Sequence, residues 1–347
     1  MRRYSNGVLV DSDRLTDRLR SYWNFGGPSA WLHRALGGVN FSPDGAFTGY
    51  QKKITVHRTS GVNDATNIYA YADGAALCEA DYDDIRFTDI YGNDLDYWIE
   101  SYDANSAVIW VECNTPASGT TPIFCYCGNA AAGAVSNGPN TFDYFQDFNA
   151  LNTADLNGQD SWTANTAWDV MTTTPYEGAK AIRSQAGGLK IATRPLVVSG
   201  WNVALALYMR TSGVANPIAG IWYLLQNTTQ ITGVYLGGSD FKHLRSAAWD
   251  SLSTTPVNNT YYKVEIALPS ASTHKVWIND AEKALGNNSN INNVSSAVNK
   301  LHVEHYSGGT YDMFFDLIVQ RKYTANEPTW QTFGAWETKR PRITIIR

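Results

Sequence analysis

The stretch IRFTDIYGNDLDYWIES, residues 85–101, alternates apolar and polar side chains on both sides of a Gly-Asn pair. A period of two is the pattern of a half-buried strand, and Gly-Asn accepts the positive φ angles of a tight turn. The stretch therefore predicts a β-hairpin, with Arg86 and Glu100 as a candidate ion pair across it. Asp96 and Glu100 share a strand face but are about 13 Å apart, too far for a pair of catalytic carboxylates.

The same alternation continues through residues 50–128 and again through residues 190–322, in short segments separated by turn residues. This rhythm is typical of antiparallel sandwiches rather than of βαβ units. Small and turn-forming residues at 128–141 mark a boundary between two such regions. We therefore predict an all-β protein of two antiparallel β-sandwiches, the second a jelly roll.

The first 40 residues differ from the rest. Leu15, Leu19 and Trp23 recur at helical spacing and form one apolar stripe. They predict a short helical arm that packs on its own domain or docks on a partner or a neighbouring copy. The predicted domains are the arm at 1–40, sandwiches at 41–141 and 142–340, and a tail at 341–347.

Composition excludes several classes of protein. The net charge is −5 and the body of the chain has no run of Lys or Arg, so we expect no nucleic-acid binding. With 17% charged and 13% aromatic residues, the chain is too apolar for intrinsic disorder. No apolar run approaches the ~18 residues of a membrane span, and the N-terminus does not resemble a secretory signal.

Candidate catalytic residues are sparse. The nearest match to alternating glycosidase acids is Glu79, Asp81 and Asp83, which lie in an expected loop of the first domain. In HVEH, residues 302–305, the strand pattern places His302 and Glu304 on one face, which we interpret as ordinary surface residues. No catalytic residue is predicted, and we expect a protein that is not an enzyme.

The four cysteines do not have the spacing of a metal or redox motif. Cys125 and Cys127 share a strand face, and buried free thiols are the preferred interpretation of all four, with one disulfide left open. Asp155, Asn157 and Asp160 form an oxygen-rich turn that could hold a structural Ca²⁺ or serve only as an Asx-rich turn. No cofactor is required.

Sugar binding depends on exposed aromatic rings that stack on sugar faces. Trp162, Trp168 and Trp249 lie in expected loops of the second domain and are the carbohydrate-binding candidates. Trp222 and Trp277 lie within expected strands, so we assign them to the core.

Five motifs in order carry a resemblance to a known family: an R-F-T-D strand, a Y-W-I-E strand, an I-W-V strand, a P-x-S-G-T loop and an aromatic strand ending in G-N. They lie at residues 86–89, 97–100, 109–111, 116–120 and 124–129. The region 41–141 resembles an uncharacterised domain of bacterial and archaeal surface proteins and some phage proteins. That family usually ends this strand in Y-x-Y-Y-G-N, whereas here Cys125 and Cys127 flank a single Tyr126.

The second domain is similar to concanavalin A-like lectin and glucanase sandwiches, on FDYFQDF at 142–148 and FFDLIVQRKYTANEPTW at 314–330. The two resemblances imply a surface protein and no particular reaction. We expect a non-enzymatic protein at a virion or cell surface that binds a glycan or neighbouring subunits, for instance a homo-oligomeric capsid decoration, spike or tail-fibre protein. A glucanase-type enzyme and a cellular adhesin are the alternatives.

Overall fold

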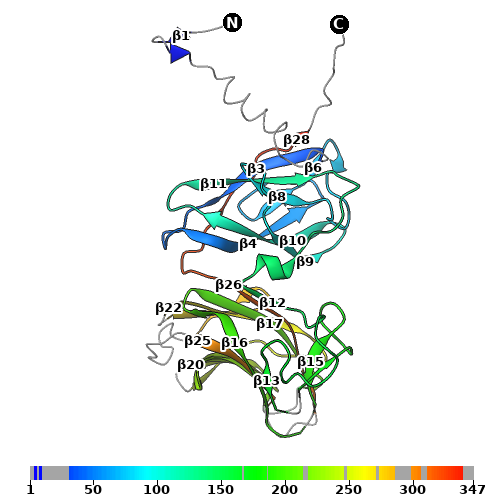
Figure 1. Ribbon diagram of the computed structural model, residues 1–347, viewed down its shortest axis with the longest axis vertical. Coiled ribbons are helices and arrows are strands. Elements are labelled where there is room, and N and C mark those ends of the chain that lie inside the picture. Colours follow the sequence, from blue (N-terminus) through cyan, green and yellow to red (C-terminus); the bar gives the residue numbers. More distant parts are fainter. Residues whose placement is uncertain are drawn as a thin grey trace. The chain divides into compact units, whose positions relative to one another are not determined.

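The computed structural model describes residues 31–165, 168–185, 187–213, 218–245, 248–270, 273–285, 298–305 and 311–338, with the backbone of β1 (Tyr4–Ser5) and β2 (Val8–Leu9). The described chain is almost entirely β-structure (Figure 1). It divides into two compact units: unit 1 combines Met1–Thr141 with Pro328–Arg347, and unit 2 is Phe142–Glu327. Unit 2 is thus inserted between two parts of unit 1. The predicted all-β fold class is confirmed.

Unit 1 is built from two sheets, ordered β5-β4-β10-β9 and β27-β3-β11-β8, with β28 also paired to β3. Among the described residues of this unit, the other elements are the β1–β2 pair, a β6–β7 hairpin and the single-turn helix α2. The β4–β5 pair is parallel. The bounds are β3 His33–Asn40, β4 Phe47–His57, β5 Asn67–Tyr69, β6 Tyr71–Ala72, β7 Ala75–Ala76, β8 Arg86–Asp89, β9 Tyr97–Tyr102, β10 Ser106–Thr115, β11 Thr120–Cys127, α2 Gly138–Thr141, β27 Trp330–Gln331 and β28 Glu337–Thr338.

The predicted hairpin at residues 85–101 forms only around its turn, where Thr88 and Asp94 make an antiparallel bridge and the Leu95 N–H donates to the Phe87 carbonyl at 2.9 Å. β8 pairs with β11 in one sheet and β9 pairs with β10 in the other, so the Gly-Asn segment crosses between sheets. Glu100 lies 3.2 Å from the ammonium of Lys53 and accepts a hydrogen bond from Trp110. Arg86 instead donates to backbone oxygens and to the Tyr97 hydroxyl, and no ion pair joins it to Glu100 among the described residues.

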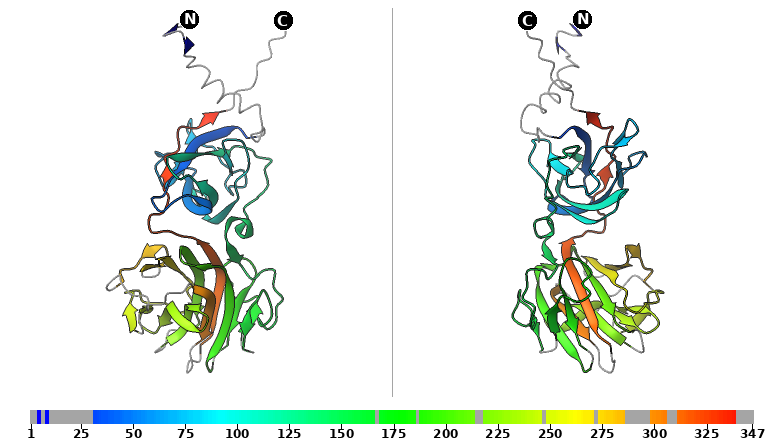
Figure 2. Two further views of the ribbon diagram at one scale, coloured as in Figure 1. Left: turned by 60° about the vertical axis from the view of Figure 1, so that its left-hand side comes forward. Right: turned by 90° about the vertical axis from the view of Figure 1, so that its right-hand side faces the viewer.

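Residues 328–338, here named the closing segment, belong to unit 1, whereas the sequence pattern predicts them in the second sandwich. Trp330 and Phe333 are each 2% exposed in the core of unit 1. The indole of Trp330 donates to the carbonyl of Lys53, 2.8 Å away. In Figure 2 the red strands of this segment lie beside the blue strands of the same unit. β3 likewise belongs to unit 1 rather than to an arm.

Unit 2 is a sandwich of an eight-stranded sheet, ordered β14-β15-β26-β17-β22-β23-β24 with β12 on β26, and a seven-stranded sheet, ordered β13-β16-β25-β18-β19-β20-β21. The bounds are β12 Tyr144–Gln146, β13 Thr163–Ala164, β14 Trp168–Met171, β15 Ala181–Ser184, β16 Lys190–Gly200, β17 Val203–Thr211, β18 Ile218–Gln226, β19 Thr229–Gly237, β20 Phe241–Arg245, β21 Ala248–Ser251, β22 Tyr262–Ser270, β23 Thr273–Ile278, β24 Ala281–Glu282, β25 Val298–His305 and β26 Met313–Lys322.

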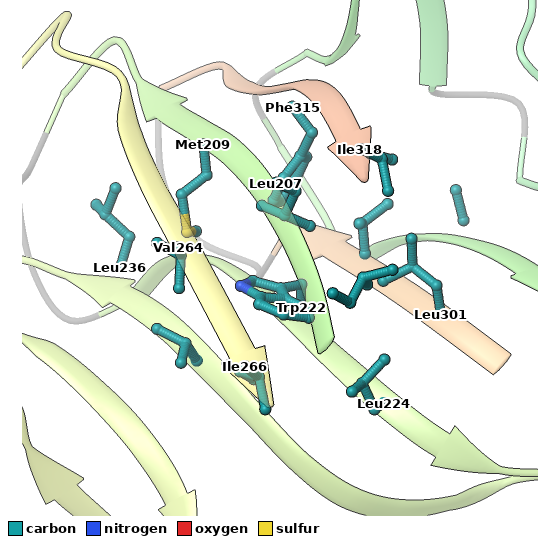
Figure 3. Packing of buried hydrophobic residues seen from close by; sticks show 14 of the residues in the cluster. Leu207, Met209, Trp222, Leu224, Leu236, Val264, Ile266, Leu301, Phe315 and Ile318 are labelled. Carbon is teal, nitrogen blue, oxygen red and sulfur yellow. The ribbon is translucent and has the colours of Figure 1, made fainter. Parts of the chain in front are cut away.

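The core of unit 2 lies between its two sheets. Leu207 and Val264 from the eight-stranded sheet meet Trp222 and Leu301 from the seven-stranded sheet (Figure 3). Alternate residues of the same strands point inward and outward, since the side-chain period of a strand is two. The inward side of each sheet is therefore buried in the core. Any binding surface on the sheets must lie on their outward sides.

Candidate functional site

The outward side of the seven-stranded sheet carries an ordered array of side chains. Trp222, Val234 and Val303 point into the core and are fully buried, so their chain neighbours point outward. Backbone pairing places these outward residues in two rows across the strands. The rows, here named the platform face, are Glu304, Ile221, Tyr235, Lys242 and Ser251, and His302, Tyr223, Gly233, Leu244 and Trp249.

Trp249, one of the three predicted carbohydrate-binding residues, is the half-buried ring of the platform face. Its ring centroid lies 4.6 Å from that of Tyr235 in an edge-on arrangement and 6.2 Å from that of Tyr223. A Cβ atom on Gly233 would lie 2.5 Å from the Tyr223 ring, so the absence of a side chain there lets this ring lie flat on the sheet. Trp249 thus packs on two aromatic rings, and this contact fixes its orientation.

His302 and Glu304 lie beside these rings, on the single strand face that the sequence predicts for them. His302 Nε2 is 3.0 Å from Glu304 Oε2, and the two side chains are only 12% and 11% exposed. The Tyr223 ring meets His302 edge-on at 5.4 Å. Donation of the Nε2 proton to Glu304 leaves the lone pair on Nδ1, for which the described residues provide no hydrogen bond.

Lys242 completes the platform face at its other side. Its ammonium lies 5.7 Å from the centroid of the Tyr235 ring. A hydrogen bond with the Tyr235 hydroxyl, and more weakly the charge of Asp240, raise the pKa of Lys242 above its usual value. The lysine is therefore charged at neutral pH and stands next to the ring on which Trp249 packs.

The other two predicted carbohydrate-binding residues are core residues, and their prediction is wrong. Trp162 is 2% exposed and Trp168 is fully buried. Their rings pack on Phe148 at 6.4 Å and on Phe315 at 5.6 Å. Neither ring can stack on a sugar, because both of its faces are covered by the sandwich.

The carboxylates of the predicted calcium turn accept hydrogen bonds from other groups of the protein. Asp160 accepts from the Tyr144 hydroxyl at 2.8 Å and from the Arg194 guanidinium at 3.3 Å. Burial opposes ionisation of Asp160, but these hydrogen bonds outweigh it and lower the pKa of the carboxyl. Asp155 accepts from the backbone of Asn157, as in an Asx turn. Calcium binding there stays a prediction that this arrangement does not favour.

The remaining predicted sites lie elsewhere. Leu15, Leu19 and Trp23 fall outside the described residues. All four cysteines are free and buried, as preferred from the sequence. Within the described part of the chain, no three His, Cys, Asp or Glu side chains gather into a metal-binding group, and no helix is long and apolar enough to span a membrane.

Sequence reasoning missed Tyr235 and Lys242, and it did not connect Tyr223 with Trp249 or with the His302–Glu304 pair. The alternation in TGVYLGG and FKHLR was visible, but strand alternation does not say which of the two faces is solvent-facing. These residues come together because of the order of the strands in the sheet. That order depends on pairing between segments that are far apart in the sequence.

Comparison with known proteins gives a family match of limited extent. A model described as a domain of unknown function, DUF2341, matches residues 81–169. The matched range begins in unit 1 and ends in β14 of unit 2. No curated protein matches the sequence.

Several solved structures share a distant likeness. One is the carbohydrate esterase vb_24B_21 of the Shiga toxin-encoding bacteriophage phi24B, with 12% identity and a TM-score of 0.40 over 53% of this chain and 99% of that one. Another is an endo-β-1,4-glucuronan lyase from the fungus Trichoderma reesei, with 12% identity and a TM-score of 0.35 over 54% and 98%. A sialidase, with 8% identity and a TM-score of 0.39 over 67% of this chain, is matched over 21% of its own length. Likeness at this level carries no information about the activity of this chain.

Proposed function

We propose that unit 2 binds a glycan on the platform face, with Trp249 as the stacking ring, and that the protein is a non-enzymatic surface component. The observation that carries this proposal is the continuous contact of Trp249, Tyr223 and Tyr235 with polar groups on both sides. Sugar rings offer an apolar face and a rim of hydroxyls, which suit an aromatic ring flanked by His302 and Lys242.

The geometry favours recognition because the rings are already in place. Tyr223 and Tyr235 are 4% and 6% exposed, and they hold Trp249 from beneath. A ring that is fixed before binding loses little side-chain entropy when a ligand arrives. The pair of His302 and Glu304 offers both a hydrogen-bond acceptor and a carboxylate to sugar hydroxyls.

We further propose that the surface is that of a virion, as a capsid decoration, spike or tail-fibre protein, with a cellular adhesin as the alternative. The resemblance of residues 41–141 to a domain of surface and phage proteins supports this setting. Several copies on one particle would raise weak glycan binding by avidity.

Glycan-array screening followed by calorimetry on the full-length protein tests the binding proposal. Trp249→Ala should weaken binding at least about tenfold, because the stacking ring is lost. Trp277→Ala is the matched control: it removes a half-buried tryptophan from the outward side of the other sheet. Equal binding by both variants, or no glycan bound by the wild type, contradicts the proposal.

A polysaccharide-active enzyme is the second candidate, and the low exposure of the His302–Glu304 pair favours it. A carboxylate that orients an imidazole is an arrangement used in general-base catalysis. A glucanase of the two-carboxylate type would need a second acid, whereas the partner of Glu304 is a histidine. New reducing ends released from bound glycans by the wild type, but not by His302→Ala, would establish this function instead.

A further inference from the structure

The platform face carries positive charge beside its stacking ring. Leu244 pairs with Trp249 across β20 and β21, and Lys242 lies two residues before Leu244 on the same side. Lys242 and Trp249 are therefore diagonal neighbours, a spacing of about 7–8 Å that a lysine side chain spans easily. Both also contact Tyr235. A sugar stacked on Trp249 would have its rim within reach of the ammonium.

The Lys242 ammonium has donors to spare. It carries three N–H groups and lies 5.7 Å from the centroid of the Tyr235 ring. Among the described residues no carboxylate lies within ion-pair distance of it. The nearest acid that acts on its charge is Asp240, whose carboxylate accepts hydrogen bonds from Ser251 and Thr254.

The other charges of the platform face do not cancel Lys242. Lys300 pairs with Leu225 and also lies on the outward side, next to His302. Glu304 is the acid of the two rows, and His302 occupies one of its oxygens. Lys242 and Lys300 thus both lie on this side of the sheet, and the carboxylate of the two rows is hydrogen-bonded to its histidine.

We propose that the glycan bound on the platform face is acidic, with a carboxylate-bearing sugar stacked on Trp249 and its carboxylate on Lys242. This inference rests on the proposed glycan binding and adds the chemical class of the ligand. A neutral sugar would leave the ammonium to water, whereas a carboxylate forms a charge-assisted hydrogen bond that is about twice as strong as a neutral one. Uronic acids and sialic acids both supply this chemistry.

The test compares matched polymers on the full-length protein. Polygalacturonate and its carboxyl-reduced form differ only in the carboxylate, and sialylated oligosaccharides before and after desialylation separate the second source. We expect the wild type to prefer the carboxylated member of one pair. Lys242→Met, which keeps the aliphatic stem, should weaken that binding roughly tenfold and Lys242→Arg should restore most of it. Lys275→Met, on the other sheet, is the control.

The outcomes separate this inference from the proposed function. If the wild type binds both members of each pair equally and Trp249→Ala loses this binding, the proposed glycan binding is supported. The proposal that the ligand is acidic is then contradicted. Preference for a carboxylated glycan that Lys242→Met does not change overturns the role of Lys242. Absence of binding to every glycan overturns both proposals. Binding that weakens with added salt in the wild type and less so in Lys242→Met supports the inference.

Discussion

Unit 2 has two outward sheet faces, and each carries a half-buried tryptophan with a lysine nearby. On the platform face Trp249 packs edge-on against Tyr235, and Lys242 lies 5.7 Å from that tyrosine ring. On the eight-stranded sheet Lys275 lies 5.9 Å from the ring of Trp277 itself. From composition alone the two faces would be judged equal candidates for a binding surface.

The two faces differ in whether their cationic side chains form ion pairs with neighbouring acids. On the eight-stranded sheet Lys275 pairs with Glu282 at 3.4 Å, and Arg321 pairs with Glu265 at 2.6 Å. Those cations are already neutralised by neighbouring acids. Within the described part of the chain, Lys242 stands over the Tyr235 ring and forms no ion pair with a carboxylate. Uncommitted charge next to a fixed ring, rather than the presence of a tryptophan, is what distinguishes a candidate site from a structural surface.

The largest effect is expected from breaking the buried pair on the eight-stranded sheet. Arg321→Met leaves Glu265, which is 7% exposed, without its guanidinium. The free energy of unfolding should fall by about 3–5 kcal/mol in urea denaturation. The double variant with Glu265→Leu should regain most of that loss, and glycan binding should stay unchanged in both. A double variant as unstable as the single one would contradict this assignment.

A pH effect is expected on the same sheet. Burial raises the pKa of Asp316 to about 7, against backbone N–H donors of Tyr176, Glu177 and Leu317 that lower it. Since the folded pKa lies above the unfolded one, the stabilising contribution is complete below about pH 4 and is lost as the pH rises through 7, by up to ~4 kcal/mol. Unfolding curves from pH 4 to 8 measure it.

Asp316→Asn serves as the comparison in that experiment. The amide does not titrate, so the slope of stability between pH 4 and 7 should be flatter than in the wild type, whatever its absolute stability. Parallel slopes in the two proteins would assign the pH dependence to other groups.

A smaller effect is expected beneath the platform face. Gly233→Ala adds a methyl group 2.5 Å from both the Tyr223 ring and the carbonyl of Trp222. Overpacking of this kind costs typically 1–3 kcal/mol and would displace Tyr223 under Trp249, which weakens glycan binding. Gly133→Ala, where a Cβ meets no atom within 4 Å, is the control. Near-UV circular dichroism and calorimetry would detect the change.

The smallest effect is expected for Lys275→Met. The pair with Glu282 is partly exposed, with 37% and 51% of the two side chains accessible, so its loss should change stability by less than about 1 kcal/mol. Thermal unfolding provides the measurement. A clear loss of glycan binding in this variant would place the site on the eight-stranded sheet and contradict the comparison of the two faces.

Local patterns in the sequence predicted the features that depend on neighbouring residues alone. Alternation identified the strands and the all-β class, and it placed His302 and Glu304 on one side of β25. It could not select partners for those strands. The Gly-Asn segment after Arg86 looks like a hairpin turn, but long-range pairing sends its two flanking strands into different sheets.

Loop position also proved a poor guide to exposure. Turn residues flank Trp162 and Trp168 and make them candidates for exposed rings, yet both fill the core of unit 2. An indole buries so much apolar area that folding a loop inward around it stabilises the folded chain. Trp249 has the same kind of sequence surroundings, and only the pairing of β20 with β21 puts it on the outward side.

The closing segment has a consequence for synthesis on the ribosome. β3 leaves the ribosome early, whereas its partner β27 follows only after all of Phe142–Glu327. At about 5–20 residues per second, that insertion takes roughly 10–40 s to translate. Unit 2 can fold during this interval, while unit 1 waits for Trp330 and Phe333. A nascent chain stalled before the closing segment should therefore expose the apolar side of β3 to chaperones.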